Sequence, residues 1–176
     1  MGMTITINGT TGIAGVDGSA ATPAVQGADT NTGIFFPAAD TIAFTEGGTE
    51  VMRLDSSANL QFNSGYGSVA TAYGCRAWVN FDGTTNTAGF CTIRASGNVT
   101  SVADNGTGDY TVNFTTAMPD ANYSAQVWAA SSGSTSAFGA AQSSITAPTA
   151  SALRFITRSP TPATVDVDRA QVSIFR

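Results

Sequence analysis

The sequence contains no histidine and no lysine, so all seven of its basic residues are arginines. Histidine is the side chain that most often acts as a general base, and it is a common ligand of zinc. Lysine is required for Schiff-base chemistry, and P-loops use it to contact phosphates. We therefore predict no catalytic residue, no metal site and no cofactor for this chain.

Charge is scarce and mostly negative. Charged residues make up 11% of the chain and the net charge is −5, with a pI near 4.3. A nucleic-acid binder needs clustered lysine or arginine to displace counterions from phosphates. We expect no nucleic-acid partner, and a surface of small polar side chains that suits neutral, polar partners.

Long apolar runs are missing as well. No run approaches the roughly 18 residues that a membrane helix requires. The N-terminal segment MGMTITINGTTG has neither the basic nor the apolar region of a signal peptide. The sequence predicts a protein that is made in a cytosol, stays soluble and does not insert into a membrane.

The chain has two cysteines, Cys75 and Cys91, which flank a segment typical of a hairpin, CRAWVNFDGTTNTAGFC. Their odd numbers place them on one face of the predicted strands, so a cross-strand disulfide is geometrically allowed. Two small buried thiols are the alternative that we favour, because a cytosol keeps thiols reduced. The sequence leaves this choice open.

Alternation of apolar and polar residues dominates the whole chain, and no stretch of helical length shows a helical repeat. Threonine, valine, phenylalanine and tyrosine at the alternating positions suit a pleated, half-buried surface. The sequence therefore predicts an all-β protein. The expected strands cover residues 4–7, 34–36, 41–45, 50–54, 60–62, 77–81, 90–95, 99–103, 110–114, 123–129, 153–157 and 165–175, the last with a break near Arg169.

The two halves of the chain differ in how they can be stabilised. Residues 66–176 hold both tryptophans and strands at regular spacings, which predicts a β-sandwich head with its own core. Residues 1–65 have too few large apolar residues to close a core as a monomer. Other copies of the chain would cover their apolar strands, so we predict an intertwined β-shaft of several identical copies in this region.

Several motifs have a structural and a chemical interpretation. DNGTGD, Asp104 to Asp109, is predicted to be a hairpin turn rather than a calcium loop. VDVDR, Val165 to Arg169, is predicted to be a strand with its aspartates facing water, ion binding or arginine pairing being the alternative. Trp78 and Trp128 lie inside alternating strands, so we interpret them as core residues rather than sugar platforms.

A glycosidase needs only two carboxylates, and by residue type some are available. The spacing of these side chains gives no reason to pair any two, so we predict that the chain is not an enzyme. The carboxylates in question are Asp109, Asp120, Asp166 and Asp168.

Two long segments resemble a known family. DTNTGIFFPAADTIAFTEGGTEVMRLDSSANLQF resembles the shaft-to-head segment of many bacteriophage tail fibres, with Ala58 where that family usually has glycine. CRAWVNFDGTTNTAGFCTIRASGNVTSVADNGTGDYTVNFTTAMPDANYSAQ is similar to a head domain of tail fibres from marine and freshwater phages. AWVNF, IRASGNV, DNGTGDYTVNF and MPDANY are the blocks that carry this similarity.

The resemblance implies a structural virion protein: a homotrimeric fibre, made in the host cytoplasm, whose β-rich head recognises and adsorbs to the host cell surface. Its expected partners are a surface glycan or protein of the host and, through the N-terminal region, other tail or virion proteins. The alternatives are a virion decoration or adaptor protein without receptor binding, and a polysaccharide-degrading enzyme.

A long uncharged stretch, Ser131 to Ser151, is the candidate receptor-binding loop. Ser134 and Gln142 offer hydrogen-bonding groups, Phe138 offers a stacking surface, and Arg158 follows the next strand and offers a charge to an acidic glycan. The alternative is a solvated loop with a weak strand near residues 137–141, or a Phe138 that is buried in the head or between subunits.

Overall fold

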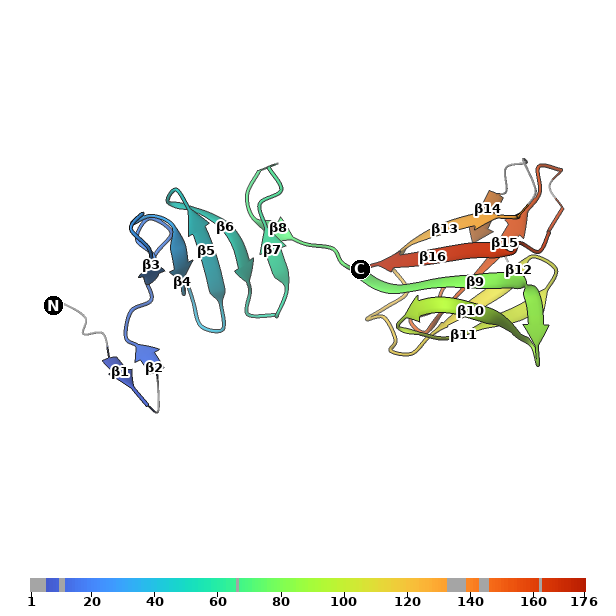
Figure 1. Ribbon diagram of the computed structural model, residues 1–176, viewed down its shortest axis with the longest axis horizontal. Helices are drawn as coiled ribbons and strands as arrows, with labels where there is room; N and C mark the ends of the chain where they lie inside the picture. Colours follow the sequence, from blue (N-terminus) through green and yellow to red (C-terminus); the bar gives the residue numbers. More distant parts are fainter. Residues whose placement is uncertain (1–5, 10–11, 66, 133–138, 143–145, 162) are drawn as a thin grey trace. The chain divides into compact units, whose positions relative to one another are not determined.

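The computed structural model describes residues 6–9, 12–65, 67–132, 139–142, 146–161 and 163–176 (Figure 1). The chain divides into two compact units, Met1–Ala72 (unit 1) and Tyr73–Arg176 (unit 2). The regular structure of the described residues is entirely β-strand, which confirms the expected all-β class. Within these residues no helix is long and apolar enough to cross a membrane.

Unit 1 contains a two-stranded hairpin and a six-stranded antiparallel sheet whose strands follow in chain order. The hairpin is formed by β1 (Thr6–Asn8) and β2 (Gly12–Ala14). The sheet consists of β3 (Val25–Gln26), β4 (Gly33–Phe35), β5 (Ile42–Glu46), β6 (Thr49–Leu54), β7 (Leu60–Phe62) and β8 (Ala70–Thr71).

Tight turns fix the register of this sheet. Gly47 and Gly48 connect β5 to β6 with φ angles of 58° and 78°, values that glycine adopts without strain. Between β6 and β7, the Asp55 carboxylate accepts hydrogen bonds from the backbone amides of Ser57 and Asn59 at 2.9 and 3.0 Å. In the same turn Ala58 has a φ of 61°, a conformation that favours the glycine found in the family that the segment resembles.

The two faces of the six-stranded sheet have different surroundings. On one face Phe35, Ala43 and Thr45 are buried, and the chain segment that precedes β3 is hydrogen-bonded to Thr45 and to the backbone of Phe36. Thr45 Oγ1 donates to the carbonyl of Ala20 at 2.8 Å. The opposite face carries most of the large apolar side chains of the sheet, and Ile42, Leu54, Leu60 and Phe62 on it are more than two fifths exposed.

Unit 2 is one eight-stranded antiparallel sheet in the order β13-β16-β9-β10-β11-β12-β15-β14. Its strands are β9 (Cys75–Thr87), β10 (Phe90–Gly97), β11 (Val99–Gly106), β12 (Asp109–Phe114), β13 (Ser124–Ala130), β14 (Gly139–Gln142), β15 (Ala152–Arg158) and β16 (Arg169–Phe175). The edge strands β13 and β14 approach each other, so the sheet is a nearly closed barrel (Figure 1). The two layers expected of a sandwich thus belong to a single curled sheet.

The inner face of the curled sheet forms the core. Phe81, Tyr110 and Phe155 are fully buried at its centre, with ring centroids 5.2 to 6.2 Å apart. The Tyr110 hydroxyl donates to the carbonyl of Gly83 at 3.0 Å and to Asp166 Oδ1 at 3.1 Å. Burial raises the pKa of this hydroxyl, so it stays neutral.

The DNGTGD motif is a hairpin turn, as predicted, but its centre lies two residues later than the Asn-Gly pair suggests. Gly106 pairs with Asp109 across the hairpin, so Thr107 and Gly108 form the turn. A side chain at Gly108 would lie 2.6 Å from the backbone nitrogen of Val165. Glycine is therefore required at this position.

The prediction of a strand with wet aspartates over 165–168 is wrong. The strand β16 begins only at Arg169, and Val167 is fully buried. Asp166 is partly buried and accepts hydrogen bonds from the Gly108 amide at 2.6 Å and from the core tyrosine. This carboxylate ties the loop to the core and does not point freely into water.

Both cysteines are free thiols, Cys75 exposed and Cys91 buried. The hairpin turn lies at Ala88 and Gly89, because Thr87 pairs with Phe90. Cys75 is the first residue of β9, whereas Cys91 lies just after the turn at the other end of that strand. The two cysteines therefore do not lie opposite each other across the hairpin, as a cross-strand disulfide would need. Burial raises the pKa of the Cys91 thiol to about 12. The expectation of two buried thiols is met by Cys91 alone.

Candidate functional site

The predicted receptor-contact residues are only partly within the described residues. Ser134 and Phe138 lie outside them, and so does the side chain of Gln142. The backbone of Gln142 pairs with Phe155 at one end of β14. Arg158 is exposed at the end of β15 and pairs with Gly139 at the other end of β14. This contact set stays a prediction.

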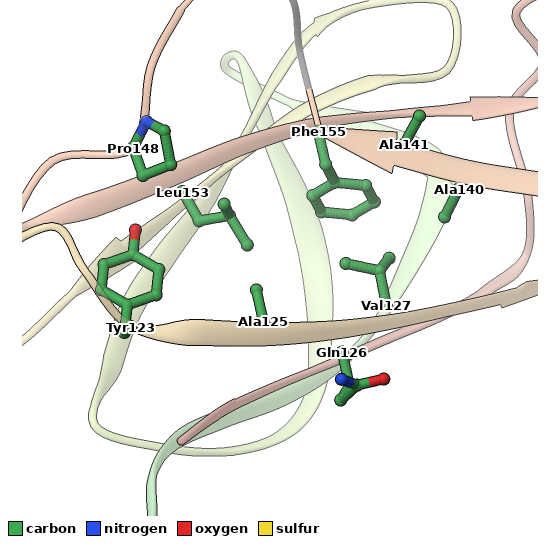
Figure 2. Close-up of a pocket in the computed structure, with 9 residues that line it drawn as sticks. All are labelled: Tyr123, Ala125, Gln126, Val127, Ala140, Ala141, Pro148, Leu153 and Phe155. Atoms are coloured by element: carbon green, nitrogen blue, oxygen red, sulfur yellow. The ribbon is translucent and has the colours of Figure 1, made fainter. Parts of the chain in front are cut away.

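A pocket of about 320 Å³ lies at the seam between the edge strands of unit 2 (Figure 2). Ala125 and Val127 of β13 point into it, and the buried side chains of Leu153 and Phe155 form its floor. Gln126 points to the other side of β13. The side chains that line it are mostly small and apolar, but the surface exposed inside the pocket is more polar than apolar.

Tyr123 is the titratable residue at the rim of this seam pocket. Its hydroxyl donates to the carbonyl of Ala152 at 3.0 Å, and burial raises its pKa. The group is thus held as a neutral structural donor. The pocket offers binding space and no base or nucleophile from its lining residues.

The four carboxylates considered for glycosidase chemistry all have structural partners. Asp109 forms two hydrogen bonds with Arg154, from Nε at 2.8 Å and from Nη2 at 2.6 Å. Its pKa lies below the ordinary range because of these bonds. Asp120 pairs with Arg176 at 2.5 Å.

The other two carboxylates lie in the region between β15 and β16. Asp166 accepts from Gly108 and Tyr110, and Asp168 accepts from the Ser132 amide at 2.8 Å. The bonds to Ser132 hold the pKa of Asp168 below its usual range. The described residues contain no group of three or more histidine, cysteine, aspartate or glutamate side chains placed to hold a metal.

The interpretation of both tryptophans as core residues is wrong. Trp78 is 43% exposed and Trp128 is 52% exposed. In β9, Ala77, Val79 and Phe81 point into the core, which leaves Trp78 on the outer face. The sequence indicates this position, because side chains alternate between the two faces of a strand. Trp78 is on the same face as the polar residues Arg76 and Asn80, opposite to the core residues.

The outer face of β13, β16 and β9 brings the two tryptophans together with uncharged polar residues. Gln171 of β16 pairs with Trp128 on one side and with Asn80 on the other. In the adjacent row, Ser173 pairs with Trp78 and with Gln126. We call this surface the tryptophan face; its members are Trp78, Asn80, Gln126, Trp128, Gln171 and Ser173.

Two local features shape this face. The indole of Trp78 lies over Gly97 of β10, where an added Cβ would be 2.5 Å from Nε1. Glycine at this position lets the ring lie close to the sheet. A hollow of about 190 Å³ opens beside the ring, lined by Asn80, Gln171 and Ser173 together with backbone of the two strands. Asn80 Oδ1 is buried and has no hydrogen-bond partner among the described residues.

Comparisons with known proteins give little. No family model matches the chain, and no curated protein matches it. Among solved structures, it is similar to the phiAB6 tailspike, which was crystallised in complex with three-repeated oligosaccharides of Acinetobacter baumannii surface polysaccharide. The TM-score is 0.40 and the sequence identity 14%, over 89% of this chain and 39% of the tailspike. The chain thus spans well under half the length of that protein.

Proposed function

We propose that the chain is a homotrimeric tail-fibre protein of a bacteriophage virion. In this proposal residues 1–65 form the shaft of three copies and attach to the virion, and residues 66–176 form a head that adsorbs to the host cell. Two lines support it. One is the sequence resemblance to tail fibres, and the other is the exposed apolar face of the unit 1 sheet.

That apolar face is the observation that carries the proposal. The register aligns Ile34, Phe44, Met52 and Phe62 in one row across the sheet. A second row aligns Ile42, Leu54 and Leu60. Six large apolar residues of unit 1 remain more than a third exposed: Val25, Phe36, Ile42, Leu54, Leu60 and Phe62.

A soluble protein gains stability when such a surface is covered. Contiguous apolar patches of this kind mark interfaces in soluble proteins. Burying the exposed part of each side chain would contribute roughly 1 kcal/mol. The opposite face of the sheet is already covered by the chain's own segment, so further copies are the natural cover for this one.

A hollow on this face suits a protruding side chain. It has a volume of about 650 Å³ and is lined in part by Phe36, Ile42 and Leu54. In a closed ring of identical subunits the same contact repeats around the axis, so each hollow would receive an apolar side chain of the next copy. Three copies follow from the fibre family that the sequence resembles.

The test is electron microscopy of the virions that carry this protein, labelled with antibodies raised against unit 2. We expect label on the tail fibres, at their distal parts. Label confined to the capsid would replace the proposal with a decoration protein, and virions without label would refute a virion role.

A further inference from the structure

The two tryptophans differ from the three aromatic residues at the centre of the unit 2 core, and they share their exposure with Tyr73, Phe90 and Phe175. Phe81, Tyr110 and Phe155 are fully buried, whereas Trp78 and Trp128 expose 43% and 52% of their surface. Aromatic surface that is left in water is a cost to the folded protein unless a partner covers it. Tryptophan is also the residue most enriched among binding hot spots.

The polar neighbours of the tryptophans are uncharged. Gln126 and Gln171 carry amide groups that both donate and accept, and Ser173 carries a hydroxyl. The nearest charges are at the ends of the face: Arg76 precedes Trp78 at one end, and at the other Arg169 begins β16 and Asp82 of β9 pairs with Arg94. The centre of the face therefore matches a neutral ligand rich in hydroxyl groups.

Asn80 supplies an independent sign of a binding site. Its Oδ1 is buried without a partner among the described residues, a state that buried acceptors rarely keep because it forfeits a hydrogen bond to water. The hollow beside it is open enough to admit a small polar group. Rotation of the Asn80 side chain would bring this oxygen to the hollow that Asn80 lines, where it would accept a hydrogen bond from a ligand hydroxyl.

The register sets the distance between the two rings. Trp128 and Trp78 lie two strands apart and two residues apart along the strands, a separation of about 12 Å between their Cα atoms on a regular sheet. This is wider than one sugar ring. A single ligand that contacts both tryptophans must be a chain of several rings.

We propose that the tryptophan face binds a chain of uncharged sugar residues. Trp78 and Trp128 provide two stacking platforms, and the carbonyl of Asn80 accepts a sugar hydroxyl between them. The inference rests on the proposed function, since it names the class of host molecule that the head contacts. It places the contact on the sheet face and not on the 131–151 loop.

The experiment begins with full-length protein on an array of purified bacterial surface glycans, both neutral and acidic. The best neutral oligosaccharide is then titrated into the protein in solution. The chain has only two tryptophans and both are on this face, so intrinsic fluorescence reports ligand contact directly. We expect a saturable change in emission and protection of both indoles from acrylamide quenching.

Three variants test the assignment, and a fourth is the control. Trp78→Ala and Trp128→Ala should each weaken binding by about tenfold or more. Phe90→Ala is the matched control, because Phe90 is 48% exposed at the opposite end of β10 from Gly97. Asn80→Leu should weaken binding while leaving stability unchanged or higher, since it removes an unpaired buried acceptor.

The outcomes separate the inference from the function on which it rests. Binding to acidic glycans alone, binding to no glycan, or unchanged binding by both alanine variants would overturn the inference. A lower oligomeric mass of these variants would also overturn it, because the tryptophans would then be contacts between copies. Each of these results leaves the virion-labelling test of the proposed function unaffected.

Discussion

Ile42 and Leu54 face each other across β5 and β6, and each leaves more than two fifths of its surface in water. A cross-strand pair of this kind normally lies against a core. In the described part of unit 1, no core lies against the face of the sheet that carries Ile42 and Leu54. Substitutions of this pair therefore test most specifically how the copies of the chain associate.

The first prediction is that replacing both residues with asparagine weakens association. Each change removes roughly 1 kcal/mol of apolar burial per subunit and places a polar amide in the interface. We expect the double variant to dissociate at protein concentrations at which the wild type stays associated, as measured by sedimentation velocity. Phe90→Asn, equally exposed but in unit 2, should keep the wild-type mass. If the double variant associated as strongly as Phe90→Asn, the apolar face would not be part of the interface between copies.

The second prediction concerns the core tyrosine. Tyr110→Phe removes the donor to Gly83 and Asp166 at a cost of about 1 to 3 kcal/mol, although Asp166 keeps the bond from the Gly108 amide. Tyr123→Phe removes one bond at the rim and should cost less. Urea unfolding of unit 2, followed by circular dichroism, measures both. A larger loss at Tyr123 would contradict the deeper burial of Tyr110.

The third prediction is a pH dependence. Arg154 lowers the pKa of Asp109 in the folded protein, so this pair stabilises the fold above the unfolded pKa of about 3.9. The contribution is lost as the pH falls through the lower, folded pKa. We expect Asp109→Asn to be less stable than the wild type at neutral pH and to lose less stability on acidification.

Thermal melting of the two proteins between neutral and strongly acidic pH measures this difference. Both partners are partly exposed, so added salt should reduce the gap. Arg154→Met removes the same interaction and should show the same flatter profile. An unchanged acid slope in Asp109→Asn would mean that other carboxylates govern acid unfolding.

The fourth prediction uses backbone strain. Ala58 has a positive φ in the β6–β7 turn, so Ala58→Gly should stabilise unit 1 by about 0.5 to 1 kcal/mol. Ala38→Gly, whose φ is not positive, should give no gain because glycine adds only chain entropy there. Chemical unfolding monitored by circular dichroism compares the two. A stabilising Ala38→Gly together with a neutral Ala58→Gly would contradict the turn geometry.

The fifth prediction is that the protein leaves glycans intact. The four aspartates considered for hydrolysis are engaged by arginines, backbone amides or the core tyrosine. Purified protein incubated with bacterial polysaccharides should release no reducing ends. Release that tracks the protein through purification would establish a hydrolase instead.

Much of the fold follows from local sequence. The strands β5, β6, β7, β10, β11 and β12 lie close to their expected bounds, because alternation and glycine-rich turns determine them locally. The two-residue strands β3 and β8 were missed, since their pairing depends on neighbouring strands and not on their own pattern. The single curled sheet depends likewise on pairings between distant strands, such as β9 with β16.

The candidate site was less predictable than the fold. On hydrophobicity alone, Trp78 and Trp128 are predicted to be core residues. The alternation of side chains along each strand instead puts both on the outer face. Only the register across β13, β16 and β9 brings Trp128, Gln171 and Asn80 into one row. Three segments that are far apart in the chain form this row, so no local sequence motif predicts it.

The central claim is that three copies assemble through unit 1. The most direct test is the molar mass of the full-length protein, measured by multi-angle light scattering at micromolar concentration. We predict close to three times the chain mass of 17.8 kDa, maintained on dilution. A stable, folded monomer under these conditions would contradict the account.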